Sequence, residues 1–132
     1  MVVRSNDIQE DEREAMESLE RELRRGTLEL LLLRILADEP TYGYELLSRL
    51  GKRSGGRLHI KEGTLYPVLY RLEDAGFVVP EWEQRARGAA RKVYRLTPAG
   101  ETRLEELTNE WQGFAAAIES ILSGQTPEEE KS

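Results

Sequence analysis

The sequence predicts a mainly α-helical chain with one small β-hairpin and a long C-terminal helix. Three observations support this prediction. Leucine-rich segments at helical spacing dominate residues 27–72. Two short segments rich in β-branched and aromatic residues, FVVPEWE and KVYRL, follow and are separated by a glycine-containing turn. Between residues 104 and 121, apolar residues recur at alternating spacings of three and four, which is typical of a long helix with one apolar face.

The composition fits one small domain. The chain has 132 residues, of which 39% are hydrophobic, so its core is modest. It contains no cysteine and a single histidine, His59, so we expect neither a disulfide framework nor a metal site. No apolar run reaches the roughly 18 residues of a membrane helix, and the acidic N-terminus lacks an apolar signal region. We therefore expect a cytoplasmic protein without a cofactor.

Charge is distributed unevenly, although the net charge is −6. Residues 41–97 hold 11 basic and 6 acidic residues, whereas residues 1–40 hold 6 and 11, and residues 98–132 hold 2 and 8. A polyanion would be attracted to the basic middle and repelled by the acidic ends. A chance fluctuation in a charge-rich sequence is the alternative, and the charge pattern alone does not separate the two.

The N-terminal third begins with an acidic stretch and continues into an apolar helix. Residues 1–22 are rich in Glu, Asp and Arg and are expected to be a helical or disordered extension. The segment TLELLLLRILA, residues 27–37, predicts a helix that Thr27 caps and that is buried on more than one face. In so small a chain, that burial suggests a second subunit, and we place Leu31 and Ile35 at the subunit interface.

A second helix is expected over YGYELLSRLGK, residues 42–52. Pro40 ends the first helix, and Thr41 is a suitable N-cap for the second. The predicted inner face consists of leucines: Leu46, Leu47 and Leu50. Lys52 and Arg53, near its end, are candidates for contacts with a nucleic-acid backbone.

The segment KEGTLYPVLYRLEDAGFV, residues 61–78, predicts a third helix with two unlike faces. Pro67 requires the helix to start near residues 61–64, and Gly76 ends it. The amide groups around Gly63 and Thr64 are then free donors at a helix N-terminus, which suits a phosphate. The apolar face consists of Leu65, Val68, Leu69 and Leu72. The opposite face consists of Thr64, Tyr66, Tyr70 and Arg71, although one of the two tyrosines can belong to the core instead.

The two predicted strands form a hairpin with a basic tip. Pro80 confines the first strand to a sheet edge or a bulge, and Gly88 allows the turn. The cations around the turn are Arg85, Arg87, Arg91 and Lys92. A solvated hairpin is the alternative, but this positive excess in an acidic chain favours contacts with phosphate.

The last helix begins at TPAGE, with Thr97 as N-cap and Pro98 in the first turn, and ends at Gly124. A helix of about 25 residues, roughly 37 Å long, is too long to pack wholly on a small domain. A subunit interface explains its length and its heptad pattern better. The seam residues are Leu104, Leu107, Trp111, Phe114, Ile118 and Ile121. The predicted divisions of the chain are 1–22, 23–97, 98–123 and 124–132.

Three short helices followed by a basic β-hairpin make a winged helix-turn-helix. In that arrangement the third helix enters the major groove of DNA and the hairpin, or wing, reaches along the backbone. This arrangement explains the two unlike faces of the third helix, since the apolar face anchors the helix to the domain and the opposite face points toward the groove. The predicted DNA-contacting residues are Lys61, Gly63, Thr64, Tyr66, Pro67, Tyr70, Arg71, Arg85, Arg87, Arg91 and Lys92.

The segments GTLELLLLRILADEPTYGYELLSRL, EGTLYPVLYRLEDAGFV and ARKVYRLTPAG resemble the PadR family of bacterial transcriptional regulators. The resemblance covers about residues 23–122. It implies a homodimeric repressor that binds a palindromic operator and dimerises through its C-terminal and first helices. It also implies that a small hydrophobic or aromatic effector releases DNA in some members. In one multidrug-binding branch, a tryptophan of the C-terminal helix stacks on flat aromatic drugs, and Trp111 falls at a similar place.

Two alternatives remain open at this point. Trp111 fits an interface anchor as well as a ligand-stacking residue, because tryptophan is a strong anchor in any subunit interface. The acidic N-terminus also fits a winged-helix module that binds protein and has lost DNA binding, although the basic hairpin argues against this. We expect no enzyme, since neither a nucleophile nor a phosphate-binding glycine loop accompanies His59 and Glu62.

Overall fold

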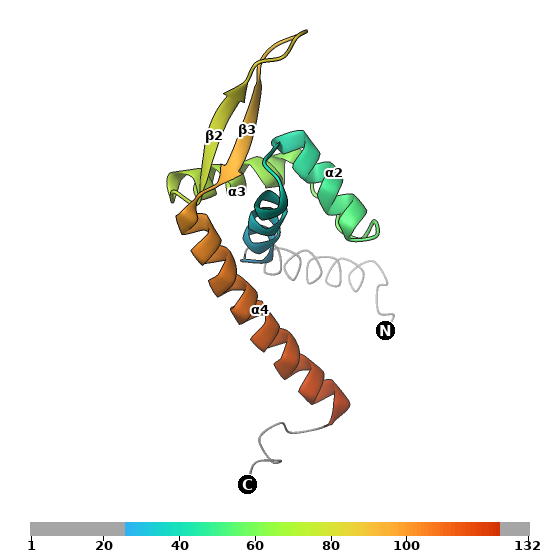
Figure 1. Cartoon of the computed structure of the whole chain (residues 1–132). Coiled ribbons are helices and arrows are strands. Elements are labelled where there is room, and N and C mark those ends of the chain that lie inside the picture. The colour runs from blue at the N-terminus through green and yellow to red at the C-terminus, as the bar shows by residue number, and fades with distance from the viewer. Residues whose placement is uncertain (1–25, 125–132) are drawn as a thin grey trace, which may run out of the picture.

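The computed structural model describes residues 26–124, so the predicted extension over residues 1–22 and the tail from residue 125 lie outside the described residues. A helix covers residues 26–38. It is followed by β1 (Thr41–Tyr42), α2 (Gly43–Arg53), α3 (Glu62–Asp74), β2 (Val78–Glu83), β3 (Arg91–Leu96) and α4 (Pro98–Ser123). The β2–β3 hairpin projects from one side of the short helices, and α4 runs away from them on another side (Figure 1). The predicted mainly α-helical fold with a hairpin and a long last helix is confirmed.

The core is formed by leucines from the short helices. Leu32, Leu46, Leu65 and Leu69 have no exposed surface, and each such side chain contributes roughly 1.5–3 kcal/mol by burial. The first three turns of α4 join this core through Leu104 and Leu107. The helix over residues 26–38 is therefore covered largely by its own chain, which explains its nearly continuous apolar sequence.

The sheet has the strand order β1-β3-β2 and is antiparallel. The sequence did not predict β1, in which Thr41 pairs with Tyr94. Thr41 is only 5% exposed, and Tyr42 is the N-cap residue of α2 without a capping side-chain hydrogen bond, so the predicted cap at Thr41 is wrong. Thr27 is no N-cap either, because residue 26 is already helical. The prediction for Pro80 is confirmed, since β2 is an edge strand.

The end of α3 is set by Gly76. This residue has a φ of 81°, its N–H donates to the Glu73 carbonyl over 3.0 Å, and the Phe77 N–H donates to the Leu72 carbonyl over 2.9 Å. This is the Schellman arrangement, which glycine favours because it adopts positive φ without strain. The predicted helix end is confirmed, and the chain turns directly from α3 into the hairpin.

The start of α4 is tied to that same turn. The Thr97 hydroxyl accepts a hydrogen bond from the Gly100 N–H over 3.0 Å, as the predicted N-cap should, and donates one to the Gly76 carbonyl over 2.6 Å. The Thr97 N–H donates to the Phe77 carbonyl over 3.1 Å. Because the two bonds from Thr97 to Gly76 and Phe77 join the N-cap of α4 to the turn that ends α3, the two helices hold a fixed angle.

A second connection joins α4 to the helix over residues 26–38. The Arg103 guanidinium lies 3.1 Å from the Glu29 carboxylate and 6.0 Å from the centre of the Phe77 ring. Beyond Leu107 α4 leaves the core, and it ends at Gly124, which has a φ of 76° as predicted for a helix-ending glycine. Between residues 26 and 124, no helix combines the length and the apolar character needed to cross a membrane.

Candidate nucleic-acid interface

The recognition helix predicted from the sequence is α3, and its two faces differ as expected. Its buried residues are Leu65, Val68, Leu69 and Leu72. Of the predicted DNA-contacting residues on this helix and at its start, five are exposed: Lys61, Gly63, Pro67, Tyr70 and Arg71. Thr64 and Tyr66 are partly buried.

Tyr66 packs within the domain rather than facing outward. Its ring lies across Gly43 at the start of α2, where a Cβ atom would be 2.5 Å from the Tyr66 hydroxyl oxygen. Only glycine permits this approach. Burial raises the pKa of the Tyr66 phenol, and the nearby Glu62 carboxylate adds to the effect. Tyr66 therefore fixes α3 against α2, and Tyr70, which is half exposed, is the tyrosine that α3 presents to solvent.

The N-terminus of α3 offers fewer free donors than the sequence suggested. The N–H groups of Thr64 and Leu65 both donate to the Lys61 carbonyl, over 2.9 and 3.0 Å. The prediction of a free amide at Thr64 is therefore wrong, while the Gly63 N–H donates to no carbonyl within residues 26–124. Glu62 places a carboxylate in this first turn, where the helix dipole already stabilises it. A phosphate at this helix end would have to compete with Glu62.

Two of the four predicted cations of the hairpin form no ion pair within the described part of the chain. Arg85 and Arg87 lie in the connection between β2 and β3, where Gly88 supplies the turn with a φ of 83°. Both side chains are exposed, and within the described part of the chain neither forms an ion pair. They are therefore available to a polyanion.

Arg91 is already held by the protein. Its guanidinium lies 3.3 Å from the Glu83 carboxylate and 4.3 Å above the centre of the Tyr42 ring. Its Nε atom is buried and has no hydrogen-bond partner in the described region. Arg91 thus joins the hairpin to β1, and it is a poorer candidate for a phosphate contact than Arg85 or Arg87.

Lys92 joins the hairpin to α3. Its ammonium lies 3.6 Å from the Glu73 carboxylate, 5.2 Å from the centre of the Tyr94 ring and 5.6 Å from that of Tyr70. The Tyr94 hydroxyl and the Glu73 carboxylate raise the pKa of Lys92, so it stays charged. This contact places the exposed side of α3 next to the hairpin, so that the two elements form one continuous surface.

The last turn of α2 and the connection to α3 add cations, of which only Lys52 and Arg53 were predicted from the sequence. Arg53 is paired with Asp38 over 2.7 Å, whereas Lys52 and Arg57 are exposed and form no ion pair among the described residues. The signal for Arg57 was present in the sequence, since no acidic residue occurs between Glu45 and Glu62.

His59 also lies in this connection and is exposed. No interaction joins it to Glu62 in the described structure. The described residues contain no cluster of three His, Cys, Asp or Glu side chains able to hold a metal ion.

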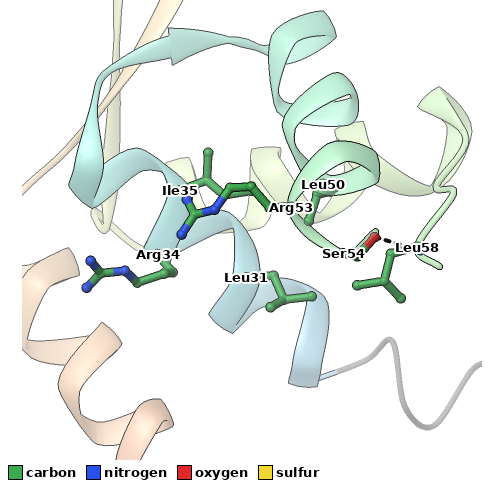
Figure 2. Close-up of a pocket in the computed structure, with 7 residues that line it drawn as sticks. All are labelled: Leu31, Arg34, Ile35, Leu50, Arg53, Ser54 and Leu58. Carbon is green, nitrogen blue, oxygen red and sulfur yellow. Dashed lines mark hydrogen bonds between the residues drawn. The ribbon is translucent and has the colours of Figure 1, made fainter. Parts of the chain in front are cut away.

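A pocket of about 320 Å³ opens between the helix over residues 26–38 and α2 (Figure 2). Its apolar lining consists of Leu31, Ile35, Leu50 and Leu58, with Arg34, Arg53 and Ser54 completing it. Asp38 pairs with both arginines over 2.7 Å. Arg53, a candidate for a nucleic-acid backbone contact, lines this pocket together with Leu31 and Ile35 of the predicted dimer interface.

The predicted seam on α4 divides into two halves. Leu104 and Leu107 are each 8% exposed and pack in the chain's own core. Ile35, the predicted interface residue on the helix over residues 26–38, is 4% exposed and packs in the same core. These three offer little surface to a partner. Trp111, Phe114, Ile118 and Ile121 are exposed, and so is Leu122, which the heptad pattern did not include. We call these five residues the α4 stripe.

Comparison with known proteins gives a consistent result. The model of the family described as "Transcriptional regulator PadR-like family" matches residues 32–106. The transcriptional regulator Rv3488 of Mycobacterium tuberculosis is 38% identical over 106 residues, which is 80% of this chain and 92% of that protein.

Solved structures agree with the sequence relatives. A PadR family regulator from Eggerthella lenta matches with a TM-score of 0.70 and 35% identity, over 85% of this chain and 96% of its own. A PadR-like regulator from Bacillus cereus matches with a TM-score of 0.69 and 30% identity, over 79% of this chain and 99% of its own.

Proposed function

This chain belongs to the PadR-like family of transcriptional regulators, and on that premise we propose that it is a homodimeric repressor of a palindromic DNA operator. The observation that supports DNA binding by these residues is the continuous surface formed by α3 and the hairpin. Lys92 holds the two elements together, Tyr70 and Arg71 are exposed on α3, and Arg85 and Arg87 are unpaired on the hairpin.

In the proposed complex, α3 lies in the major groove and the hairpin follows the backbone. The exposed face of α3 contacts base edges, whereas the unpaired cations contact phosphates and fix the position of the protein. The cations we assign to phosphate are Lys52, Arg57, Lys61, Arg71, Arg85 and Arg87. Arg91 and Lys92 act mainly by holding the hairpin in place.

We assign dimerisation to the α4 stripe. Five large apolar side chains are exposed along the second half of one helix, and an exposed apolar patch of this kind often marks a protein–protein contact. A second copy of the same stripe would cover them in an isologous contact. The two copies of α3 must lie about 34 Å apart to reach successive major grooves, and the paired α4 helices would set that distance.

The proposed function is tested by the fluorescence anisotropy of a labelled duplex taken from the region upstream of the chain's own gene. A scrambled duplex is the control, and both are measured at two salt concentrations. We expect tight, salt-sensitive binding with a preference for the upstream duplex. Weak and equal binding to both, with no sequence selected from a random duplex library, would contradict the proposal and favour a protein-binding module.

Arg87→Ala should weaken binding to the upstream and scrambled duplexes alike. Arg87 is assigned to a phosphate, so its loss should lower the slope of log K against log salt by about 0.9. Arg95→Ala is the matched control, because it makes the same change in net charge on the same hairpin but removes an arginine that is already paired with Glu81. A loss confined to the upstream duplex would contradict the phosphate assignment.

We also propose an effector site at Trp111, where a flat aromatic compound would release DNA. Trp111 is 43% exposed at the N-terminal end of the α4 stripe, and its ring lies 6.1 Å from that of Phe114, so a further ring can stack beside the pair. Such a compound shifts DNA affinity only by the difference between its affinities for the DNA-bound and released dimers.

Planar dyes should quench the fluorescence of Trp111 in proportion to their occupancy of this site. Trp82→Phe protein is the appropriate sample, because the chain contains only 2 tryptophans and Trp111 is then the sole reporter. The quenching dyes should also lower the anisotropy of duplex bound to the unmutated chain. No quenching across a broad panel would exclude the effector site and leave Trp111 as an interface anchor.

A further inference from the structure

Trp82 is a tryptophan that the fold does not bury. It lies on β2, and 67% of its surface is exposed, whereas tryptophan is highly buried on average. Its backbone pairs with Lys92 in the hairpin, which any residue of extended conformation could do. No role for Trp82 followed from the sequence. Its exposure needs a reason outside the packing of the chain.

The strand register shows which way Trp82 faces. Directly paired residues of an antiparallel ladder lie on the same face of the sheet, so Trp82 shares a face with Lys92. Lys92 contacts Glu73 and Tyr70 of α3. Val78, on the same face and nearer the core, is buried. Trp82 therefore extends the face of the hairpin that looks toward α3, beyond the point where the core ends.

The charges around Trp82 favour an anionic partner. Its neighbours Glu81 and Glu83 lie on the opposite face, where Arg95 and Arg91 pair with them over 3.3 Å. On the Trp82 face, the Glu73 carboxylate is paired with Lys92. Farther along the hairpin follow the unpaired Arg85 and Arg87, so the indole lies between the α3 contact and the basic tip.

We infer that Trp82 contacts DNA, with its ring against a deoxyribose and its Nε1–H donating to a phosphate oxygen beside the groove that α3 enters. An indole nitrogen only donates hydrogen bonds, and a phosphate diester only accepts them. The apolar ring suits the sugar, and contacts to sugar and phosphate position a protein on the duplex without reading sequence. This inference rests on the proposed function and adds an uncharged anchor to it.

Three variants, measured by anisotropy on the upstream duplex, test the inference. Trp82→Ala should weaken binding at least roughly tenfold, the equivalent of one lost hydrogen bond to a charged group. Trp82→Phe keeps the ring and loses only the N–H, so its loss should be smaller. Neither should change the salt slope, because no cation is removed, whereas Arg87→Ala should lower it by about 0.9.

A spectroscopic measurement on the unmutated chain makes the test independent of folding in the variants. Protein labelled with fluorotryptophan gives one ¹⁹F resonance for each of its 2 tryptophans, and Trp82→Phe identifies which belongs to Trp82. We expect the Trp82 resonance to shift when duplex is added. Wild-type affinity for Trp82→Ala, or an unmoved Trp82 resonance at saturating duplex, would overturn the inference and leave the proposed function intact. If the unmutated chain binds no duplex at all, the proposed function itself fails.

Discussion

Gly100→Ala is expected to destabilise the chain by about 3 kcal/mol, the upper end of what overpacking a buried site costs. Gly100 is buried in the first turn of α4. A Cβ atom at this position would overlap the carbonyl oxygen of Phe77 and lie 2.7 Å from the Cδ1 atom of Leu96. The Leu96 side chain has some freedom to rotate, but the Phe77 carbonyl belongs to the backbone.

The Phe77 carbonyl cannot move away at low cost. It accepts the hydrogen bond from the Thr97 N–H, and the Thr97 hydroxyl is in turn bonded to Gly76 and Gly100. A shift large enough to admit a methyl group would stretch or break these bonds, each worth about 1 kcal/mol. The alternative, a displaced α4, would pull Leu104 and Leu107 out of the core.

Urea denaturation at a fixed protein concentration measures this prediction, because unfolding of an oligomer depends on concentration. Gly113→Ala is the matched control, since it makes the same substitution in the same helix where nothing beyond the adjacent residues and the local helix backbone lies within 4 Å of the new methyl group. Alanine is favoured over glycine inside helices, so Gly113→Ala should stabilise the chain by up to about 1 kcal/mol. Changes of the same sign in both variants would show that the contact at Phe77 is not the cause.

Ile118→Glu is expected to convert the dimer into a monomer. Ile118 is an exposed member of the α4 stripe, and in the proposed dimer a carboxylate at this position would be buried without a partner, which costs several kcal/mol. A monomer can hold only one half-site of the operator. Losing the second, linked contact should weaken operator binding roughly 100- to 10,000-fold.

Light scattering after size exclusion reports the mass of this variant, and anisotropy on the upstream duplex reports its affinity. Ala116→Glu is the control, because it adds the same charge on the opposite side of the helix, where Ala116 is exposed. It should remain a dimer. A dimeric Ile118→Glu with wild-type affinity would place the subunit interface elsewhere, with the pocket beside Leu31 as the next candidate.

Features that depend on neighbouring residues in the chain were predictable from the sequence. Gly76, Thr97 and Gly124 mark helix ends through local hydrogen bonds and backbone conformation, and Pro80 restricts its strand through its missing N–H. Strand β1 was not predictable in this way, because two residues have no periodicity and their conformation depends on β3, about 50 residues later. Thr41 was predicted to be a helix cap because its local sequence does not show that it pairs with Tyr94.

The candidate interface was predictable as a region but not residue by residue. All four hairpin cations look alike in the sequence. The structure separates them because Arg91 meets Glu83 across the hairpin and Lys92 meets Glu73 on α3. Tyr66 and Tyr70 lie one helical turn apart, and only the position of Gly43 on α2 shows that Tyr66 faces inward. Exposure of Trp82 likewise requires knowing where the core stops.

The hydrogen bonds between Thr97, Gly76 and Phe77 make α4 a lever. They join the long helix to the end of α3, so a rotation of α4 about its far end moves the recognition helix with it. The 26 residues of α4 span about 39 Å, and at that radius a tilt of about 5° displaces α3 by roughly 3 Å. In the proposed dimer, two such displacements add, and a small repacking beside Trp111 would take both recognition helices out of register with successive major grooves.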